Sequence, residues 1–161
     1  MSPMLGRIFP ILVLVTPTSI AAAQFAHFPT SSILGEADGD LFGFSVACAG
    51  DVNNDGLNDL IVGATGTDVN GNLSGSAYIY SGADGSLLYL FRGPSADSYF
   101  GRSVAGVGDV NGDGFDDVII SAPGSASSAV FGTAQVFSGI DGSVIYTFGT
   151  DQLQDGFGAA V

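Results

Sequence analysis

Short runs in which apolar residues alternate with polar ones, bounded by Gly, Asn and Asp, recur along the chain and predict β-strands. In the first half four such runs follow one another, at residues 45–49, 60–64, 76–81 and 86–91. An Asp-Gly pair at residues 84–85 separates the last two runs, which favours a tight hairpin between antiparallel strands. The pattern therefore predicts a four-stranded unit and an all-β protein.

This pattern returns 58 residues later, so the chain contains an internal repeat. The segment FGFSVA at 42–47 returns as FGRSVA at 100–105, and GDVNNDG at 50–56 returns as GDVNGDG at 108–114. A third copy begins with FGAAV at 157–161. Repeated four-stranded units bury both faces of each sheet by packing side by side around an axis, which predicts blades of a β-propeller.

Two repeats cannot close a ring, because propellers typically have four to eight blades, so we expect the chain to be a fragment or to assemble. Residues 32–35 resemble the segments before the later FG pairs, which predicts an outer strand of an incomplete blade in the lead-in. The expected organisation is a signal peptide at 1–23, a lead-in at 24–41, a first repeat at 42–99, a second repeat at 100–156 and the start of a truncated third repeat at 157–161.

The N-terminus has the organisation of a secretory signal peptide. Arg7 is followed by an apolar run at residues 8–15 and by an Ala-x-Ala ending at Ala23. The run is too short to cross a bilayer as a helix, so we expect a secreted or surface protein without a transmembrane segment. A buried N-terminal strand is the alternative. Cys48, the single cysteine, cannot form an internal disulfide and is expected to be a small buried strand residue.

The charge balance is strongly acidic, with 16 Asp and Glu against 3 Lys and Arg and a formal net charge of −13. A protein that binds nucleic acid or an acidic membrane surface needs clustered cations, so the composition excludes both partners. Charged residues make up only 12% of the chain and hydrophobic ones 46%. This balance fits a folded domain and excludes a disordered acidic tail.

Each repeat carries the acidic loop Asp-x-Asn-x-Asp-Gly-x-x-Asp between its first two predicted strands. Alternate side-chain oxygens of such a loop can face one centre, and the Gly allows the sharp turn, which predicts one calcium ion per loop. Position seven would add a backbone carbonyl. The alternative is a pair of Asx-rich turns that bind no metal. The predicted ligands are Asp51, Asn53, Asp55, Leu57 and Asp59 in the first loop, and Asp109, Asn111, Asp113, Phe115 and Asp117 in the second.

These loops open like an EF-hand but do not close like one. Position twelve is Val62 in the first copy and Ile120 in the second, where an EF-hand has a bidentate Glu. Position nine must therefore close each site. With three carboxylates per loop, the expected calcium dissociation constant is on the order of 10⁻⁴ to 10⁻³ M, the range of extracellular calcium modules.

The ordered set of FG pair, Ser-Val-Ala, acidic loop and the segments IVGA at 61–64 and ISAP at 120–123 resembles the FG-GAP repeats of integrin α-chain β-propellers and related bacterial surface proteins. The resemblance covers residues 42–161. It implies a propeller with calcium in its strand-connecting loops and exposed loops for adhesion or ligand binding. The ligand would be an unidentified protein or carbohydrate at the cell surface. Of the family's functional residues, only the two calcium loops have counterparts here.

Two other functions stay open, a non-catalytic propeller segment of a larger secreted hydrolase and a calcium-stabilised structural spacer. The residues present predict no enzyme. His27 is the single histidine and lies close to the predicted mature end, and the sequence has no Gly-x-Ser-x-Gly elbow or phosphate-binding P-loop. We therefore expect no catalytic residue, and no cofactor other than calcium.

Overall fold

The structure, a computed structural model, describes residues 32–153 and 156–161. The predicted signal peptide and His27 lie outside these residues. The described part of the chain consists almost entirely of strands and turns. Its one helical element is a short 3₁₀ turn, η2, at Ala126–Ser128. The all-β prediction is therefore confirmed.

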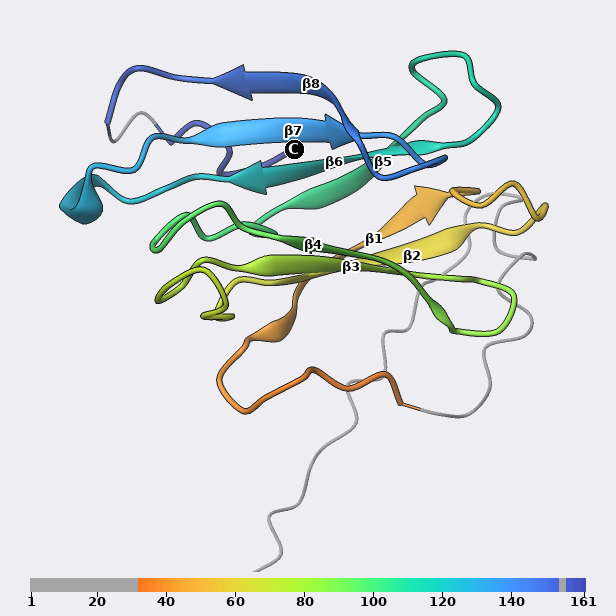
Figure 1. Cartoon of the computed structure of the whole chain (residues 1–161), viewed down its shortest axis with the longest axis horizontal. Helices are drawn as coiled ribbons and strands as arrows, with labels where there is room; N and C mark the ends of the chain where they lie inside the picture. The colour runs from red at the N-terminus through yellow and green to blue at the C-terminus, as the bar shows by residue number, and fades with distance from the viewer. Residues whose placement is uncertain (1–31, 154–155) are drawn as a thin grey trace, which may run out of the picture.

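Two four-stranded antiparallel sheets of the same topology form the molecule and lie against each other as layers (Figure 1). Within each sheet the strands follow one another in chain order. This up-and-down order in two consecutive units is that of two propeller blades. The first sheet contains β1 (Phe42–Gly50), β2 (Asp59–Ala64), β3 (Ser76–Tyr80) and β4 (Leu87–Arg92), and the second β5 (Val104–Gly108), β6 (Asp117–Ala122), β7 (Thr133–Phe137) and β8 (Val144–Gly149).

Both predicted Asp-Gly hairpins are present. The Ser81 N–H donates to the Ser86 carbonyl at 2.8 Å, and the Ser138 N–H donates to the Ser143 carbonyl at the same distance. Each hairpin joins the last two strands of its sheet in an antiparallel pair. The turn chemistry of the sequence thus sets the same strand pairing in both repeats.

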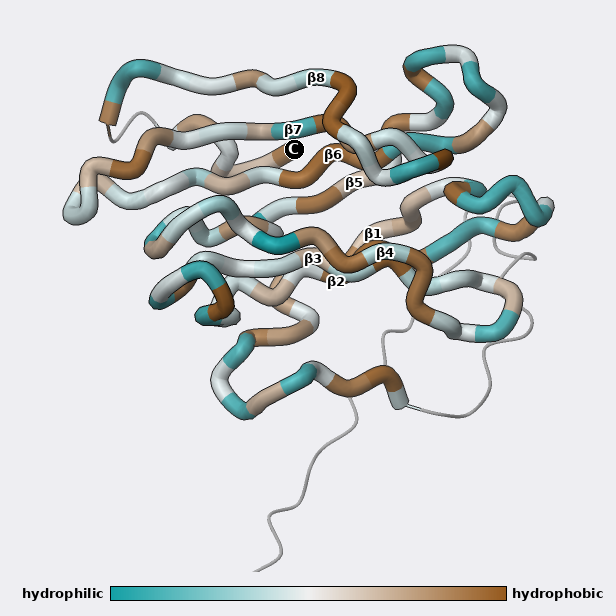
Figure 2. Tube along the Cα trace, in the orientation of Figure 1, coloured by the Kyte–Doolittle hydropathy of each residue, from teal (hydrophilic) through white to brown (hydrophobic). Residues whose placement is uncertain are grey.

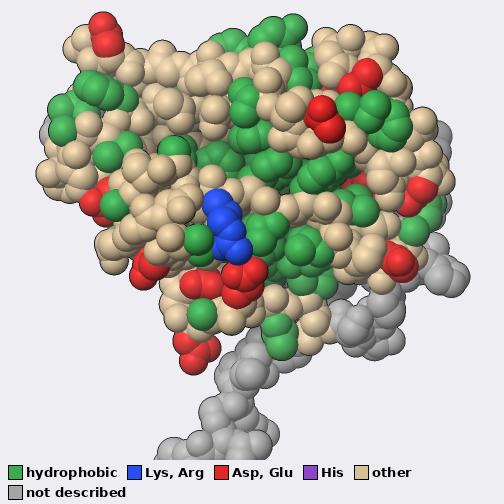
Figure 3. Space-filling view, viewed as in Figure 1, with side chains coloured by type: hydrophobic (Ala, Val, Ile, Leu, Met, Phe, Trp, Pro, Cys, Tyr) green, Lys and Arg blue, Asp and Glu red, His purple; other side chains and the backbone are tan. Residues whose placement is uncertain are grey.

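The main hydrophobic core lies between the two sheets. From β4, the Phe91 ring packs on Phe137 of the second sheet with centroids 4.5 Å apart. Phe100, from the second FG pair, is 2% exposed and meets Phe137 edge-on at 6.0 Å. Figure 2 shows hydrophobic stretches in β4 and β6, and Figure 3 shows hydrophobic side chains gathered where the sheets meet. Buried aromatic area therefore holds one blade on the next.

Near the first strands, the two sheets approach each other through backbone. A Cβ added to Gly63 of β2 would overlap the carbonyl oxygen of Gly101, the glycine of the second FG pair. That carbonyl accepts a hydrogen bond from the Ser45 hydroxyl at 2.8 Å. A Cβ on Gly106 of β5 would likewise overlap the carbonyl of Ala49 in β1. Glycine is required here because side-chain atoms have no room between the sheets.

In the second blade, the counterparts of the first-blade interface residues are exposed, because no further blade covers them among the described residues. Tyr146 and Phe148 of β8 are the repeat counterparts of Tyr89 and Phe91, yet they are 50% and 49% exposed. Val110 is 42% exposed, whereas its counterpart Val52 is fully buried. Residues at matching repeat positions are therefore more buried in the first blade than in the second, because among the described residues only the first blade has a neighbour on this face.

This difference predicts unequal costs for two matched substitutions. Phe91→Ala should lower the free energy of unfolding by about 2 to 3 kcal/mol, because it opens a cavity against Phe137. Phe148→Ala should cost less than about 1 kcal/mol, since half of that side chain is already in water. Denaturant unfolding of both variants measures the difference. Equal losses would contradict this account of the core.

On the other face of the first blade, the lead-in supplies part of the cover. Ile33 of the lead-in packs on a cluster that contains Tyr78, and Phe42, at the start of β1, meets Tyr78 edge-on with ring centroids 5.3 Å apart. Glu36 pairs with Arg92 of β4 at 3.9 Å. Residues 32–35 form no strand within the described chain, so their assignment as an outer blade strand stays a prediction.

Cys48 is exposed, so the prediction that it is buried is wrong. It lies in β1 opposite Leu60, on the face of the first sheet that points away from the second blade. The lead-in covers β2 and β3 on this face but leaves β1 open, where Phe44 and Val46 are also exposed. The strand assignment was correct, and the missing cover explains the difference.

Candidate functional site

The two acidic loops project from the same edge of the two sheets, each between the first two strands of its blade (Figure 1). They share one backbone conformation. Position four is left-handed in both, with φ of 56° at Asn54 and 77° at Gly112, and position six has φ of 89° at Gly56 and 91° at Gly114. Only glycine adopts the latter region readily, which accounts for the Gly at position six.

The first carboxylate organises each loop by accepting backbone N–H groups. Asp51 Oδ1 accepts from the Asp55 N–H at 2.9 Å, and Asp51 Oδ2 accepts from the Gly56 N–H at 2.8 Å. Asn53 Nδ2 donates to Asp55 Oδ2 at 2.8 Å, and Asp55 Oδ1 accepts from the Leu57 N–H at 2.9 Å. The corresponding bonds recur in the second loop among Asp109, Asn111, Asp113, Gly114 and Phe115.

The ninth residue of each loop is a buried carboxylate that joins the loop to the neighbouring hairpin. Asp59 Oδ2 accepts from the Val52 N–H at 2.9 Å, and Asp59 Oδ1 accepts from the Gly82 N–H at 2.9 Å. Asp117 accepts from Val110 and Gly139 in the same way, at 2.9 and 3.0 Å. Both Asp side chains are fully buried. The ninth carboxylates thus have a structural role that the loop pattern alone did not reveal.

Burial and hydrogen bonding shift two of these carboxyl groups in opposite directions. Burial raises the pKa of Asp59 above its ordinary value, and the N–H groups of Gly82 and Val52 offset part of that rise. At Asp109, which is exposed, the loop N–H groups, that of Gly114 foremost, lower the pKa. The exposed carboxyl is thereby held in its charged form.

The predicted ligands of each loop lie in one nine-residue segment, but they do not converge as a finished metal centre. Within residues 32–153 and 156–161, no three Asp, Glu, His or Cys side chains are close enough together to hold a metal ion. The first, third and fifth side chains bond to the loop itself, and the ninth points to the hairpin. Their donors are all oxygen, the ligand type of calcium.

Asp116, at position eight of the second loop, reaches across to the first loop. Its Oδ2 accepts from the Asp51 N–H at 2.8 Å, and its own N–H donates to the Asp51 carbonyl at 3.1 Å. A Cβ on Gly50 would overlap the Asp116 side chain. Sequence reasoning missed this residue. The one available signal was the acceptor side chain at position eight in both loops, Asn58 and Asp116.

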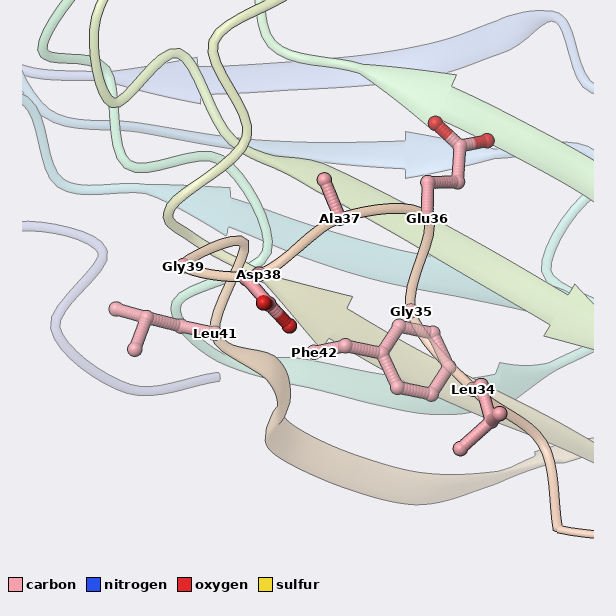
Figure 4. A pocket seen from close by; sticks show the side chains of 8 residues that line it. All are labelled: Leu34, Gly35, Glu36, Ala37, Asp38, Gly39, Leu41 and Phe42. Carbon is pink, nitrogen blue, oxygen red and sulfur yellow. The ribbon is translucent and has the colours of Figure 1, made fainter. Parts of the chain in front are cut away.

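A surface pocket lies away from these loops, in the lead-in. It is lined by residues 34–39, 41 and 42 (Figure 4). Phe42 and Leu34 lie on one side of it, and Leu41 points away from them. None of the predicted ligands contributes to this pocket, so it does not belong to the acidic loops.

Comparison with known proteins places the repeats in a family. The model of the FG-GAP repeat matches residues 42–80 and 100–137, one match in each sheet. In the part of the chain that is described, no helix has the length and hydropathy needed for a bilayer crossing.

Several integrin α-chains are similar in sequence. Integrin alpha-2 of Bos taurus is 39% identical over 92 residues, which are 52% of this chain and 8% of that protein. Integrin alpha-7 of Mus musculus is 40% identical over 109 residues, 64% of this chain and 9% of the relative. The chain thus spans about a tenth or less of the length of these relatives. With the repeat matched once in each four-stranded sheet, the chain is an FG-GAP repeat protein that contains two integrin α-like propeller blades.

Proposed function

We propose that this chain is an exported, calcium-binding propeller module for cell-surface adhesion or ligand binding, and that calcium stiffens its interstrand loops. One observation carries the proposal. Two loops with the same oxygen donors adopt the same conformation at the same edge of the molecule. Three carboxylates in the nine residues of the first loop, and four in those of the second, repel one another unless a cation lies among them.

Calcium would be held by side-chain oxygens at positions one, three, five and nine and by the carbonyl of position seven. The bound ion supplies positive charge that offsets the clustered carboxylates. The loop N–H groups already orient Asp51 and Asp55, so these two positions would need only rotation of their side chains, whereas Asp59 would also have to share or exchange its bonds to Val52 and Gly82. The ligand set remains Asp51, Asn53, Asp55, Leu57 and Asp59, with Asp109, Asn111, Asp113, Phe115 and Asp117 in the second loop.

The adhesion role is supported by the similarity to integrin α-chains, and export by the predicted signal peptide. The ligand would be a protein or carbohydrate at the cell surface, bound by the loops between the second and third strands. These loops, at residues 65–75 and 123–132, differ between the repeats in sequence and by one residue in length. A spacer role, or a place beside a hydrolase domain in a longer protein, uses the same calcium-bound blades without a ligand. We assign no catalytic role to the residues present.

Calcium titration of the full chain by calorimetry tests the proposal. We expect two sites with dissociation constants on the order of 10⁻⁴ to 10⁻³ M, and none in the Asp55→Ala, Asp113→Ala double variant. At calcium one hundred times above the dissociation constant, each site should add about 2.7 kcal/mol to the free energy of unfolding.

The matched control is Asp84→Ala with Asp141→Ala. These exposed carboxylates lie one in each Asp-Gly hairpin, so the control changes the net charge equally without touching the loops. It should keep both sites. A folded parent that gives no binding heat, or a control that loses binding as the loop variant does, would overturn the calcium proposal.

A further inference from the structure

We infer that Asp116 of the second blade is a positioning residue for the first calcium loop, so that the first loop is the tighter of the two sites. The inference rests on the proposed function. The geometry points to it because Asp116 bonds both to the N–H and to the carbonyl of Asp51, the first ligand of the other loop. Two bonds to one peptide segment restrict the rotation of that segment.

The position of Asp116 is itself fixed from several sides. It precedes Asp117, whose two oxygens are held by Val110 and Gly139. The Gly139 carbonyl accepts a hydrogen bond from the Tyr89 hydroxyl of the first blade at 2.8 Å. A Cβ on Gly139 would overlap the Asp116 carbonyl. The contact with the first loop therefore comes from a rigid part of the blade interface.

The second loop provides an internal comparison. Asp109 occupies the place of Asp51 in the repeat, but it is exposed and carries no such contact among the described residues. The second loop has two bonds of its own, from the Gly112 N–H to Asp109 Oδ1 at 2.7 Å and from the Ser138 hydroxyl to Asp113 Oδ2 at 3.3 Å, but both come from within its own blade. A ligand that is already held in place loses less conformational entropy on binding, which raises affinity. The first loop should therefore bind calcium more tightly than the second.

Single-loop variants of the full chain measure each affinity separately. Asp113→Ala leaves the first loop alone, and Asp55→Ala leaves the second. Calorimetry with calcium should give a roughly tenfold lower dissociation constant for the first loop, the size typical of residues that position metal ligands. This comparison needs no change at Asp116. Equal affinities, or a tighter second loop, would overturn the inference while leaving the calcium proposal intact.

Substitution of Asp116 tests the cause. In the Asp113→Ala background, Asp116→Ala should weaken binding by the same roughly tenfold factor. Asp116 is position eight of the second loop and not one of its predicted ligands, so in the Asp55→Ala background Asp116→Ala should weaken that loop much less than it weakens the first, and retained binding also reports that the variant is folded. Asp116→Asn keeps a side-chain oxygen that can accept from the Asp51 N–H, and it should restore most of the affinity.

The outcomes separate the two proposals. Equal weakening of both loops by Asp116→Ala, or failure of Asp116→Asn to restore the first, would overturn the positioning role. Absence of calcium binding from the folded parent would overturn the proposed function itself.

Discussion

The Asp59→Ala variant should lose about 3 kcal/mol of unfolding free energy even in a calcium chelator. The substitution leaves the buried N–H groups of Val52 and Gly82 without their acceptor, and each such group costs roughly 1 to 3 kcal/mol. Relief of the burial that raises the pKa of Asp59 offsets part of this cost. The loss is expected without metal because both bonds are made to the protein.

Denaturant unfolding with excess chelator measures this loss. Asp84→Ala is the control, since its exposed carboxylate accepts one backbone N–H, that of Ser86, in the same blade. It should cost less than about 1 kcal/mol. A chelator-treated Asp59→Ala variant as stable as this control would mean that Asp59 acts only through calcium.

The Gly63→Ala variant should lose about 3 kcal/mol, because its methyl group would overlap the carbonyl oxygen of Gly101. The methyl carbon is fixed directly to one backbone and the oxygen belongs to another, so neither can rotate away, and relief requires the two sheets to separate. Separation would also break the hydrogen bond from Ser45 to that carbonyl. The expected result is a lower unfolding midpoint, together with faster amide exchange in both β2 and β5.

Gly149→Ala is the matched control in a strand of the other blade. Its added Cβ would meet its nearest neighbours at 3.5 Å, which is ordinary van der Waals contact. Since alanine restricts the unfolded chain more than glycine does, this variant should be unchanged or slightly more stable. A Gly63→Ala variant as stable as Gly149→Ala would show that the sheets can accommodate a methyl group at Gly63.

The sequence alone was sufficient to predict the strands and hairpins, because local alternation and turn residues determine them. The first strand was predicted too short. β1 begins at Phe42 because a register shift lets Phe42 pair with Ala64 before the regular ladder starts at Ser45. Such irregularities depend on the partner strand, which a local pattern does not contain.

Contacts between distant residues were beyond the reach of the pattern. The bond from Asp116 to Asp51 joins residues 65 positions apart, and it depends on how closely the two blades pack. The exposure of Cys48 likewise depends on which strands the lead-in covers. For the acidic loops, the pattern indicated the candidate ligands, which stay a prediction, but the hairpin bonds of Asp59 required the tertiary structure.

The two sheets lie closer together at one side of their interface than at the other, because the residues between them differ in size. At the first strands, Gly63 meets Gly101 and Ala49 meets Gly106, so the layers are separated by little more than backbone. At the last strands, the rings of Phe91 and Phe137 keep the layers apart. When further blades pack with the same difference in spacing, the stack of blades curves toward the side on which the sheets are closer together. The glycines on the closer side and the phenylalanines on the wider side therefore determine the curvature of the stack of blades together. Larger residues in place of these glycines, or smaller residues in place of these phenylalanines, would straighten the stack.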